Sequence, residues 1–165
     1  MNSKRLALLR HAKSSWDDPN LSDPDRPLTS RGRRAATRLG GYLRKNEVRF
    51  DLVLCSSSTR TVQTVELLRL KTGTEILIED DLYAASSDEL LSRLRRVPDR
   101  VTSLLLVGHN PGLGELAMSL AGDHGTISSF PTASFVDLRM ANLTWDSLRP
   151  GVCDLMSFIT PRDLI

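Results

Sequence analysis

The sequence is poor in aromatic residues, has no strong excess of either charge and contains no long apolar run. Phe, Trp and Tyr make up 5% of its 165 residues, and the formal net charge is +2. Proteins that bind nucleic acid need many cations, and those that bind single strands also need aromatic side chains for stacking. No segment approaches the roughly 18 consecutive apolar residues of a membrane-spanning helix. We therefore expect neither a nucleic-acid partner nor a membrane partner.

Cysteine is also scarce, and both cysteines, Cys55 and Cys153, lie inside apolar runs. Two cysteines do not make a disulfide framework, and the N-terminal residues lack the apolar core and cleavage site of a secretory signal. We therefore expect a cytoplasmic protein in which both thiols are reduced.

Length and composition favour one soluble globular domain that spans residues 1–165. Hydrophobic residues make up 40% and charged residues 25%, which is too apolar for a disordered chain. Within residues 1–71 there are 15 basic and 7 acidic side chains. This excess includes a basic cluster of Arg31, Arg33, Arg34 and Arg38. We interpret the cluster as a solvated helix face, and the alternative is a docking face for an acidic partner.

Short apolar runs alternate with segments of helical spacing along the chain. The runs predict strands over residues 6–9, 51–55, 75–79, 103–107, 133–138 and 152–159. Helical spacing predicts helices over residues 30–45 and 59–70, then after residue 86 and from residue 111. This alternation predicts an α/β fold, a three-layer α/β/α sandwich around a mostly parallel central sheet.

Local signals predict where three of these helices begin or end. Ser86 and Glu89 have the spacing of a capping box at the start of the third helix. Asn110 and Pro111 have the order of an N-cap and a first helical residue for the fourth. Gly73 is expected to end the second helix.

Basic side chains follow three of the predicted strands, at the point where each strand ends. Arg10 and His11 come after the first strand, Arg60 after the second and His109 after the fourth. Ligands of open α/β sheets bind beyond the carboxyl ends of the strands. We therefore expect these four side chains to meet at one rim of the sheet.

This combination of residue types suits phosphoryl transfer. Arginine offers planar, bidentate donors to phosphate oxygens and stays charged at physiological pH. A histidine imidazole can attack phosphorus as a covalent nucleophile. Cationic donors stabilise the negative charge that spreads over the equatorial oxygens in the transition state. The helix from Pro111 is expected to add free N–H groups at the same rim.

We predict no metal and no other cofactor. The first loop holds four carboxylates, but a divalent cation would need them aimed at the centre of the rim. The four are Asp17, Asp18, Asp23 and Asp25. Two histidines lack a third zinc ligand of suitable spacing, and Asp17 or Asp25 is the remaining alternative for that ligand.

Four blocks of the sequence resemble the histidine phosphatase superfamily, which includes phosphoglycerate mutases and acid phosphatases. In chain order they are LLRHAKSSW (8–16), DRPLTSRG (25–32), SSSTRTVQTVE (56–66) and LLLVGHNPGL (104–113). The small size and the RPLT and GHNP motifs are most similar to the SixA-type phosphohistidine phosphatase branch. The resemblance implies a minimal phosphoglycerate mutase-like core and a covalent phosphohistidine intermediate.

The resemblance also implies four catalytic residues. His11 would be the nucleophile that carries the phosphoryl group. Arg10 and Arg60 would hold the phosphate oxygens. His109 would complete the pocket and stabilise the transferring group.

Further matched residues have less direct roles. Arg26 would line the substrate pocket, and Ser14 would donate a hydrogen bond to the substrate, with capping of the loop as the alternative for Ser14. Gln63 and Thr64 match a recurrent block, where helix packing is the favoured interpretation.

Position 84 departs from the family pattern. Many phosphomonoesterases of this superfamily have a carboxylate there, in a Leu-x-Glu context, that protonates the leaving alcohol. Here the residue is Ala84, and we expect the nearby Asp80 and Asp81 to be solvated, a role as proton donor being the alternative. A site without a dedicated acid favours phosphohistidine, because imidazole leaves more easily than an alkoxide.

The sequence therefore predicts a metal-independent phosphatase that acts on phosphohistidine in proteins. One alternative is a broad phosphomonoesterase for phosphotyrosine or small phosphate esters, and another is a non-catalytic phosphate-binding module. A cysteine phosphatase based on Cys55 is disfavoured, because its Cys-x4-Arg spacing is one residue short of the usual phosphate loop. His124 has no predicted role. Trp16 is expected either to wall the pocket or to anchor the first loop.

Overall fold

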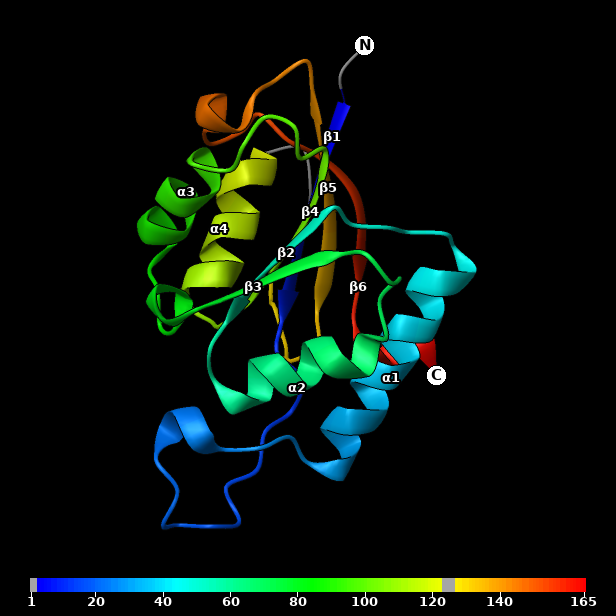
Figure 1. Cartoon of the computed structure of the whole chain (residues 1–165), viewed down its shortest axis with the longest axis vertical. Coiled ribbons are helices and arrows are strands. Elements are labelled where there is room, and N and C mark those ends of the chain that lie inside the picture. The colour runs from blue at the N-terminus through cyan, green and yellow to red at the C-terminus, as the bar shows by residue number, and fades with distance from the viewer. Residues whose placement is uncertain (1–2, 123–126) are drawn as a thin grey trace.

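The computed structural model describes residues 3–122 and 127–165, which contain one six-stranded sheet (Figure 1). The strands are β1 (Ser3–Arg10), β2 (Leu52–Ser56), β3 (Glu75–Glu79), β4 (Ser103–Gly108), β5 (Phe135–Ala141) and β6 (Asp154–Ile159). Their order in the sheet is β3-β2-β4-β1-β5-β6. The pairs among the first four of these are parallel, whereas β5 runs antiparallel to both β1 and β6. The predicted α/β fold with a mostly parallel sheet is confirmed.

Four helices cover the two faces of this sheet (Figure 1). They are α1 (Ser30–Lys45), α2 (Thr59–Leu68), α3 (Ser87–Arg95) and α4 (Gly112–Ala121). Successive side chains of a strand point to opposite faces, and β1 buries both sets. Leu6 and Leu8 pack in the apolar layer beneath α3 and α4, while Ala7 and Leu9 pack in the layer beneath α1 and α2. None of the described helices is both long and apolar enough to cross a membrane.

Two of the predicted helix boundaries are wrong, and the capping box is confirmed. The Ser86 hydroxyl accepts from the Glu89 N–H at 3.1 Å, and the Glu89 carboxylate accepts from the Ser86 N–H at 3.0 Å. Helix α2 ends before Gly73, because Arg69 already turns the chain with a left-handed φ of 48°. Helix α4 begins at Gly112, with Pro111 as its N-cap. The Asn110 side chain, one residue before this N-cap, accepts a hydrogen bond from the N–H of Gly114.

The carboxyl ends of β1, β2 and β4 form one rim, as the sequence predicts. Arg10 pairs with Gly108 in the parallel register of β1 and β4, and the His11 N–H donates to the Gly108 carbonyl at 3.1 Å. The loop from β1 to α1 then extends beyond this end of the sheet, as the blue segment of Figure 1 shows. It contains a short 3-10 helix, η1 (Asp23–Asp25). Parallel pairing therefore brings residues from three strands, and one long loop, to the same place.

Helix α1 lies against α2, and the two approach closely at Gly40. A Cβ atom at Gly40 would lie 2.3 Å from the carbonyl oxygen of Leu68, whereas a Cβ atom at Gly41 would meet nothing within 4 Å. The two adjacent glycines therefore have different physical roles. Gly40 permits the contact between the helices, while Gly41 only adds flexibility to the unfolded chain.

We predict opposite effects of alanine at these two positions. Gly40→Ala should lower the free energy of unfolding by about 1–3 kcal/mol, because the methyl group pushes the helices apart. Gly41→Ala should raise it by about 0.5–1 kcal/mol, because alanine is the better helix former. Urea unfolding of both variants measures the difference, and an equal effect of the two would contradict the close approach.

Candidate active site

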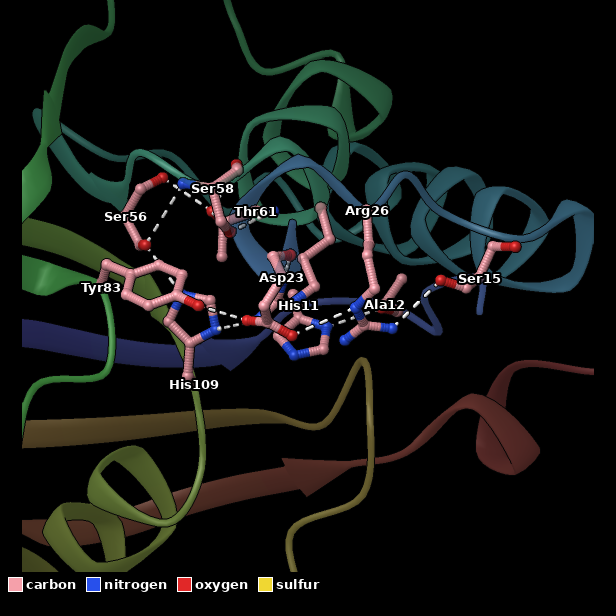
Figure 2. Close-up of polar contacts among 11 residues, drawn as sticks. His11, Ala12, Ser15, Asp23, Arg26, Ser56, Ser58, Thr61, Tyr83 and His109 are labelled. Carbon is pink, nitrogen blue, oxygen red and sulfur yellow. Dashed lines mark hydrogen bonds and ion pairs between the residues drawn. The ribbon is translucent and has the colours of Figure 1, made fainter. Parts of the chain in front are cut away.

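The structure brings together the four side chains predicted to be catalytic. The ring centroids of His11 and His109 are 5.3 Å apart, and a guanidinium nitrogen (Nη2) of Arg60 lies 3.5 Å from Nδ1 of His109. Arg10 is close enough to Arg60 and His11 for its charge to affect the pKa of His11. Apart from the half-buried Arg10, these side chains are buried. Figure 2 shows the two histidines facing one another.

Local structure fixes where each of these residues points. Arg10 is the last residue of β1, and Arg60 is the second residue of α2, whose N-cap is Ser58. The Ser58 hydroxyl accepts from the Thr61 N–H, which starts α2 directly after β2. The hydroxyl of Thr64 on α2 accepts from the N–H of Ala12 at 3.0 Å and so ties the residue after His11 to this helix.

His11 is held with one ring nitrogen free. Its Nδ1 lies 2.7 Å from the carbonyl oxygen of Ala12. A carbonyl can only accept, so Nδ1 carries the proton and the lone pair is on Nε2. Burial, with smaller effects from the charges of His109, Arg60 and Arg10, lowers the pKa of His11 to about 3. The ring is therefore neutral at physiological pH and has an unprotonated nitrogen for attack.

His109 is also neutral, and its partners fix the other tautomer. Arg60 can only donate, so Nδ1 of His109 accepts and Nε2 donates to the Ser56 hydroxyl at 2.7 Å. Burial and the Arg60 charge lower the pKa of His109 to about 4. The sequence does not single out Ser56 for this role, although it is the last residue of β2 and begins the matched SSSTR run.

The arginines carry donors that no protein group satisfies. In the part of the chain that the structure describes, three buried side-chain atoms lack a hydrogen-bond partner: Arg10 Nε, Arg60 Nε and Ser134 Oγ. Two of the three belong to the arginines that the sequence predicts to hold phosphate. Buried donors without partners are costly, and an anion between the two arginines would satisfy them. The chemistry of the pocket therefore fits a phosphoryl group.

Asp23, one of the four carboxylates of the first loop, points into this site. Its carboxylate lies 3.2 Å from Arg26 Nε and 2.9 Å from Arg60 Nη2, and it accepts a hydrogen bond from the Tyr83 hydroxyl (Figure 2). The Tyr83 hydrogen bond, helped by Arg60 and Arg26, lowers the pKa of Asp23 to about 2. Asp23 is therefore ionised. The Tyr83 ring also lies 5.3 Å from the His109 ring.

Sequence reasoning missed both Asp23 and Tyr83 as site residues. Tyr83 stands one residue before the position where the family has its proton donor, which was the available signal. The sequence gives no such signal for Asp23, because the loop carries three other aspartates at irregular spacing. Only the fold of η1 decides which of the four turns inward.

Arg26 reaches the site through Asp23 rather than directly. Its guanidinium is buried, lies 3.5 Å above the ring of Trp16 and donates to the Ser15 carbonyl. Trp16 is 75% exposed, so it covers Arg26 instead of anchoring the loop in the core. Ser14 pairs through its backbone with Leu28, and its hydroxyl has no hydrogen bond to any residue that the structure describes.

Two aspartates and a glutamine named from the sequence are solvated or support the first loop. Asp80 and Asp81 are exposed in the 3-10 helix η2 (Asp80–Leu82). The Gln63 side chain accepts from the N–H of Leu28, as expected for a packing role. His124 lies outside the described residues.

The helix dipole argument needs one correction. Two N–H groups in the first turn of α4 are not free, because Leu113 donates to the His109 carbonyl at 2.9 Å and Gly114 donates to the Asn110 side chain at 3.0 Å. The start of α4 therefore positions His109 and Asn110 instead of offering these two donors to a phosphate.

The structure also bears on cysteine and metal chemistry. Cys55 is fully buried, and burial raises the pKa of its thiol to about 12. A protonated, buried thiol is a poor nucleophile, which removes the cysteine phosphatase hypothesis. Within residues 3–122 and 127–165, no group of three or more His, Cys, Asp or Glu side chains could hold a metal ion.

Comparison with known proteins gives the family. The sequence model of the histidine phosphatase superfamily (branch 1) matches residues 6–97. The chain belongs to the histidine phosphatase superfamily. A relative in Mycobacterium tuberculosis, the uncharacterized protein Rv1276c, is 39% identical over 162 residues, covering 93% of this chain and all of that protein.

Solved structures of this superfamily share the fold. A protein of Agrobacterium tumefaciens, provisionally assigned as the phosphohistidine phosphatase SixA, has a TM-score of 0.83 and 31% identity, covering 96% of this chain and 98% of that chain. The protein histidine phosphatase SixA complexed with tungstate has a TM-score of 0.81 at 22% identity, covering 98% and 99%. The latter likeness shows the fold alone. The predicted family, its phosphoglycerate mutase-like fold and its likeness to SixA are confirmed.

The two buried histidines predict an acid-sensitive fold. Unfolded histidines take up protons near pH 6.5, whereas His11 and His109 do so only near pH 3 to 4. On acidification the unfolded chain therefore binds protons first, and stability is lost as the pH falls below 6.5. Between pH 7 and 5, each of the two should cost about 2 kcal/mol of unfolding free energy.

Urea unfolding at pH 7 and pH 5 tests this expectation. His11→Gln and His109→Gln should each lose less stability than the parent chain over this interval. All other titrating groups, including His124, are common to the three proteins and cancel in the comparison. The same loss in all three would contradict the buried, neutral state of these rings.

Proposed function

We propose that the protein is a metal-independent phosphatase that forms a covalent phosphoryl intermediate on His11 and acts on phosphohistidine in proteins. One observation carries this proposal. A neutral histidine with an unprotonated Nε2 stands beside two arginines, each of which has a buried Nε that no residue of the described ranges satisfies. This arrangement offers a nucleophile and an anion site at the same point.

The first step transfers the phosphoryl group to the enzyme. Nε2 of His11 attacks phosphorus, the bond from phosphorus to the substrate nitrogen breaks, and its electron pair stays on the leaving imidazole. Arg10 and Arg60 hold the equatorial oxygens, where negative charge accumulates in the transition state. The Ala12 carbonyl stabilises the proton on Nδ1 of His11 as the ring gains positive charge.

The second step returns the enzyme to its starting state. Water attacks phosphorus, the bond to Nε2 of His11 breaks, and inorganic phosphate leaves. The electron pair returns to Nε2, and the proton that the attacking water loses leaves with the phosphate or passes to solvent. His109 lies against the His11 ring and Arg60, where it can donate to a phosphate oxygen once an anion raises its pKa.

Two features favour phosphohistidine over alkyl phosphate esters. Position 84 carries no carboxylate, and the carboxylates of Asp80 and Asp81 lie exposed, so none of these three positions supplies an acid to protonate an alkoxide. Imidazole leaves without such help when its second nitrogen is protonated. The likeness to SixA structures supports the same substrate class.

A phosphorylated protein is therefore the proposed partner, with a small phosphorylated substrate as the alternative. We also propose a cytoplasmic location, which the two free, buried cysteines support. A broad phosphomonoesterase acting on phosphotyrosine or small esters is the second candidate function. The absence of a carboxylate at position 84 is compatible with this candidate too, because an aryl phosphate releases a phenolate, which needs less help from an acid than an alkoxide does.

Loss of the nucleophile tests the proposal and separates it from a non-catalytic phosphate-binding module. His11→Ala should reduce phosphate release from a histidine-phosphorylated protein by at least about a thousandfold, because the variant lacks the imidazole that attacks phosphorus. Circular dichroism should show an unchanged fold. Full activity of His11→Ala, or no phosphate release by the parent chain, would contradict the proposal.

Metal removal should leave the rate unchanged. The pocket supplies its positive charge from two arginines, so the chemistry needs no divalent cation. Turnover measured with and without EDTA, after dialysis, checks this expectation. Loss of activity that added Mg²⁺ or Zn²⁺ restores would show that a metal takes part.

A further inference from the structure

The proposed reaction leaves one charged group of the site without a role. The carboxylate of Asp23 is 44% exposed, yet both arginines that it binds are buried, with 7–8% of their side chains exposed. It therefore lies on the solvent side of the pocket, above buried cations. Figure 2 shows Asp23 between the pair Tyr83 and His109 on one side and Arg26 on the other.

The donors of the Arg60 guanidinium are only partly used by Asp23. Its two terminal nitrogens donate to Asp23, Nη1 to the carbonyl at 2.7 Å and Nη2 to the carboxylate at 2.9 Å. Its Nε is buried and has no partner in the described part of the chain. One edge of the guanidinium thus holds Asp23, while Nε on the other edge is left for a phosphoryl oxygen. The Arg60 guanidinium would therefore contact the Asp23 carboxylate through Nη2 and a bound phosphoryl group through Nε.

The position of Asp23 suits contact with the leaving group. In-line transfer to His11 places the leaving group opposite the attacking Nε2, and a leaving group that belongs to a protein must extend toward solvent. Asp23 is a partly exposed group beside Arg60, so its carboxylate is accessible from solvent. Its two carboxylate oxygens can accept about four hydrogen bonds, and Arg26, Arg60 and Tyr83 supply three. One acceptor position therefore remains.

An ionised carboxylate discriminates between leaving groups. Its three donors keep Asp23 charged, so it can accept a hydrogen bond but cannot give a proton to an alkoxide. The oxygen of a phosphate ester carries no hydrogen to donate. The imidazole of phosphohistidine does carry one when the ring nitrogen that is not phosphorylated is protonated.

We propose that Asp23 is a specificity-determining residue that accepts the N–H of the non-phosphorylated ring nitrogen of phosphohistidine. This inference rests on the proposed function. The contact stabilises the protonated form of the phosphorylated ring. When Nε2 of His11 bonds to phosphorus, the phosphorus–nitrogen bond of the substrate breaks and its electron pair stays on that nitrogen. The other nitrogen keeps its proton, and a neutral imidazole leaves.

Tyr83 and Arg26 are positioning residues for this carboxylate. The Tyr83 hydroxyl binds the same oxygen as Arg60, and the Arg26 guanidinium, stacked on Trp16, binds the other. The carboxylate is therefore fixed before a substrate arrives. The aromatic face of Tyr83 beside His109 offers a flat wall against which an imidazole can lie.

Substrate discrimination by Asp23→Asn tests the proposal. The two substrates are a peptide phosphorylated on histidine with phosphoramidate, and p-nitrophenyl phosphate, whose leaving group has no N–H. Asp23→Asn should lower kcat/KM for the phosphohistidine peptide by about tenfold to a hundredfold, the worth of a hydrogen bond to a charged group. The ratio of the two kcat/KM values should fall by at least about tenfold.

Asp25→Asn is the matched control. It removes one negative charge from the same 3-10 helix, and its carboxylate binds only the Ser22 hydroxyl among the described residues. Both kcat/KM values should stay within about twofold of the parent chain. Asp23→Glu, which keeps the charge, should retain more of the ratio than Asp23→Asn.

The outcomes separate this inference from the function on which it rests. If Asp23→Asn lowers both kcat/KM values in the same proportion, Asp23 only holds Arg60, and the inference is overturned. An unchanged ratio with unchanged rates overturns it as well. If the parent chain cleaves p-nitrophenyl phosphate but leaves the phosphohistidine peptide intact, the proposed function falls, and the inference with it.

Discussion

The structure depends on burying several basic side chains beside one another at the carboxyl ends of β1, β2 and β4. Desolvation and mutual repulsion lower the pKa values of Arg10, His11 and His109, so both imidazoles are neutral. An anionic substrate would relieve this repulsion and bind the two unpartnered arginine nitrogens. Asp23 is the only carboxylate among the described residues that pairs with Arg60. The basic side chains are thus arranged to bind an anion.

The sheet makes this burial possible. Parallel pairing of β1, β2 and β4 delivers Arg10, His11 and His109 to one rim from distant parts of the chain. Backbone hydrogen bonds at the strand ends, such as that of His11 to Gly108, fix the positions of the basic residues. The loop from β1 to α1 adds Asp23, which pairs with both Arg60 and Arg26. The buried histidines that suit phosphoryl transfer are also the groups whose lowered pKa values predict an acid-sensitive fold.

Sequence patterns predicted the parts of the molecule that local rules control. Apolar runs located all six strands, and the residues after them gave the rim, because strand direction fixes where a strand ends. The patterns failed where a residue other than the expected one ends or caps a helix. Arg69, not Gly73, ends α2. The Asn110 side chain caps α4 from the position before the N-cap Pro111. They also missed Asp23 and Tyr83. These residues are 60 positions apart in the sequence, and their contact depends on the fold of the loop between β1 and α1.

The central claim is that His11 carries the phosphoryl group during turnover. The most direct measurement is mass spectrometry of the protein after brief exposure to a histidine-phosphorylated peptide and an alkaline quench, which preserves phosphoramidates. The account predicts one added phosphoryl group, located on His11. A phosphoryl group on any other residue, or substrate turnover with no phosphorylated protein at any time, would contradict it.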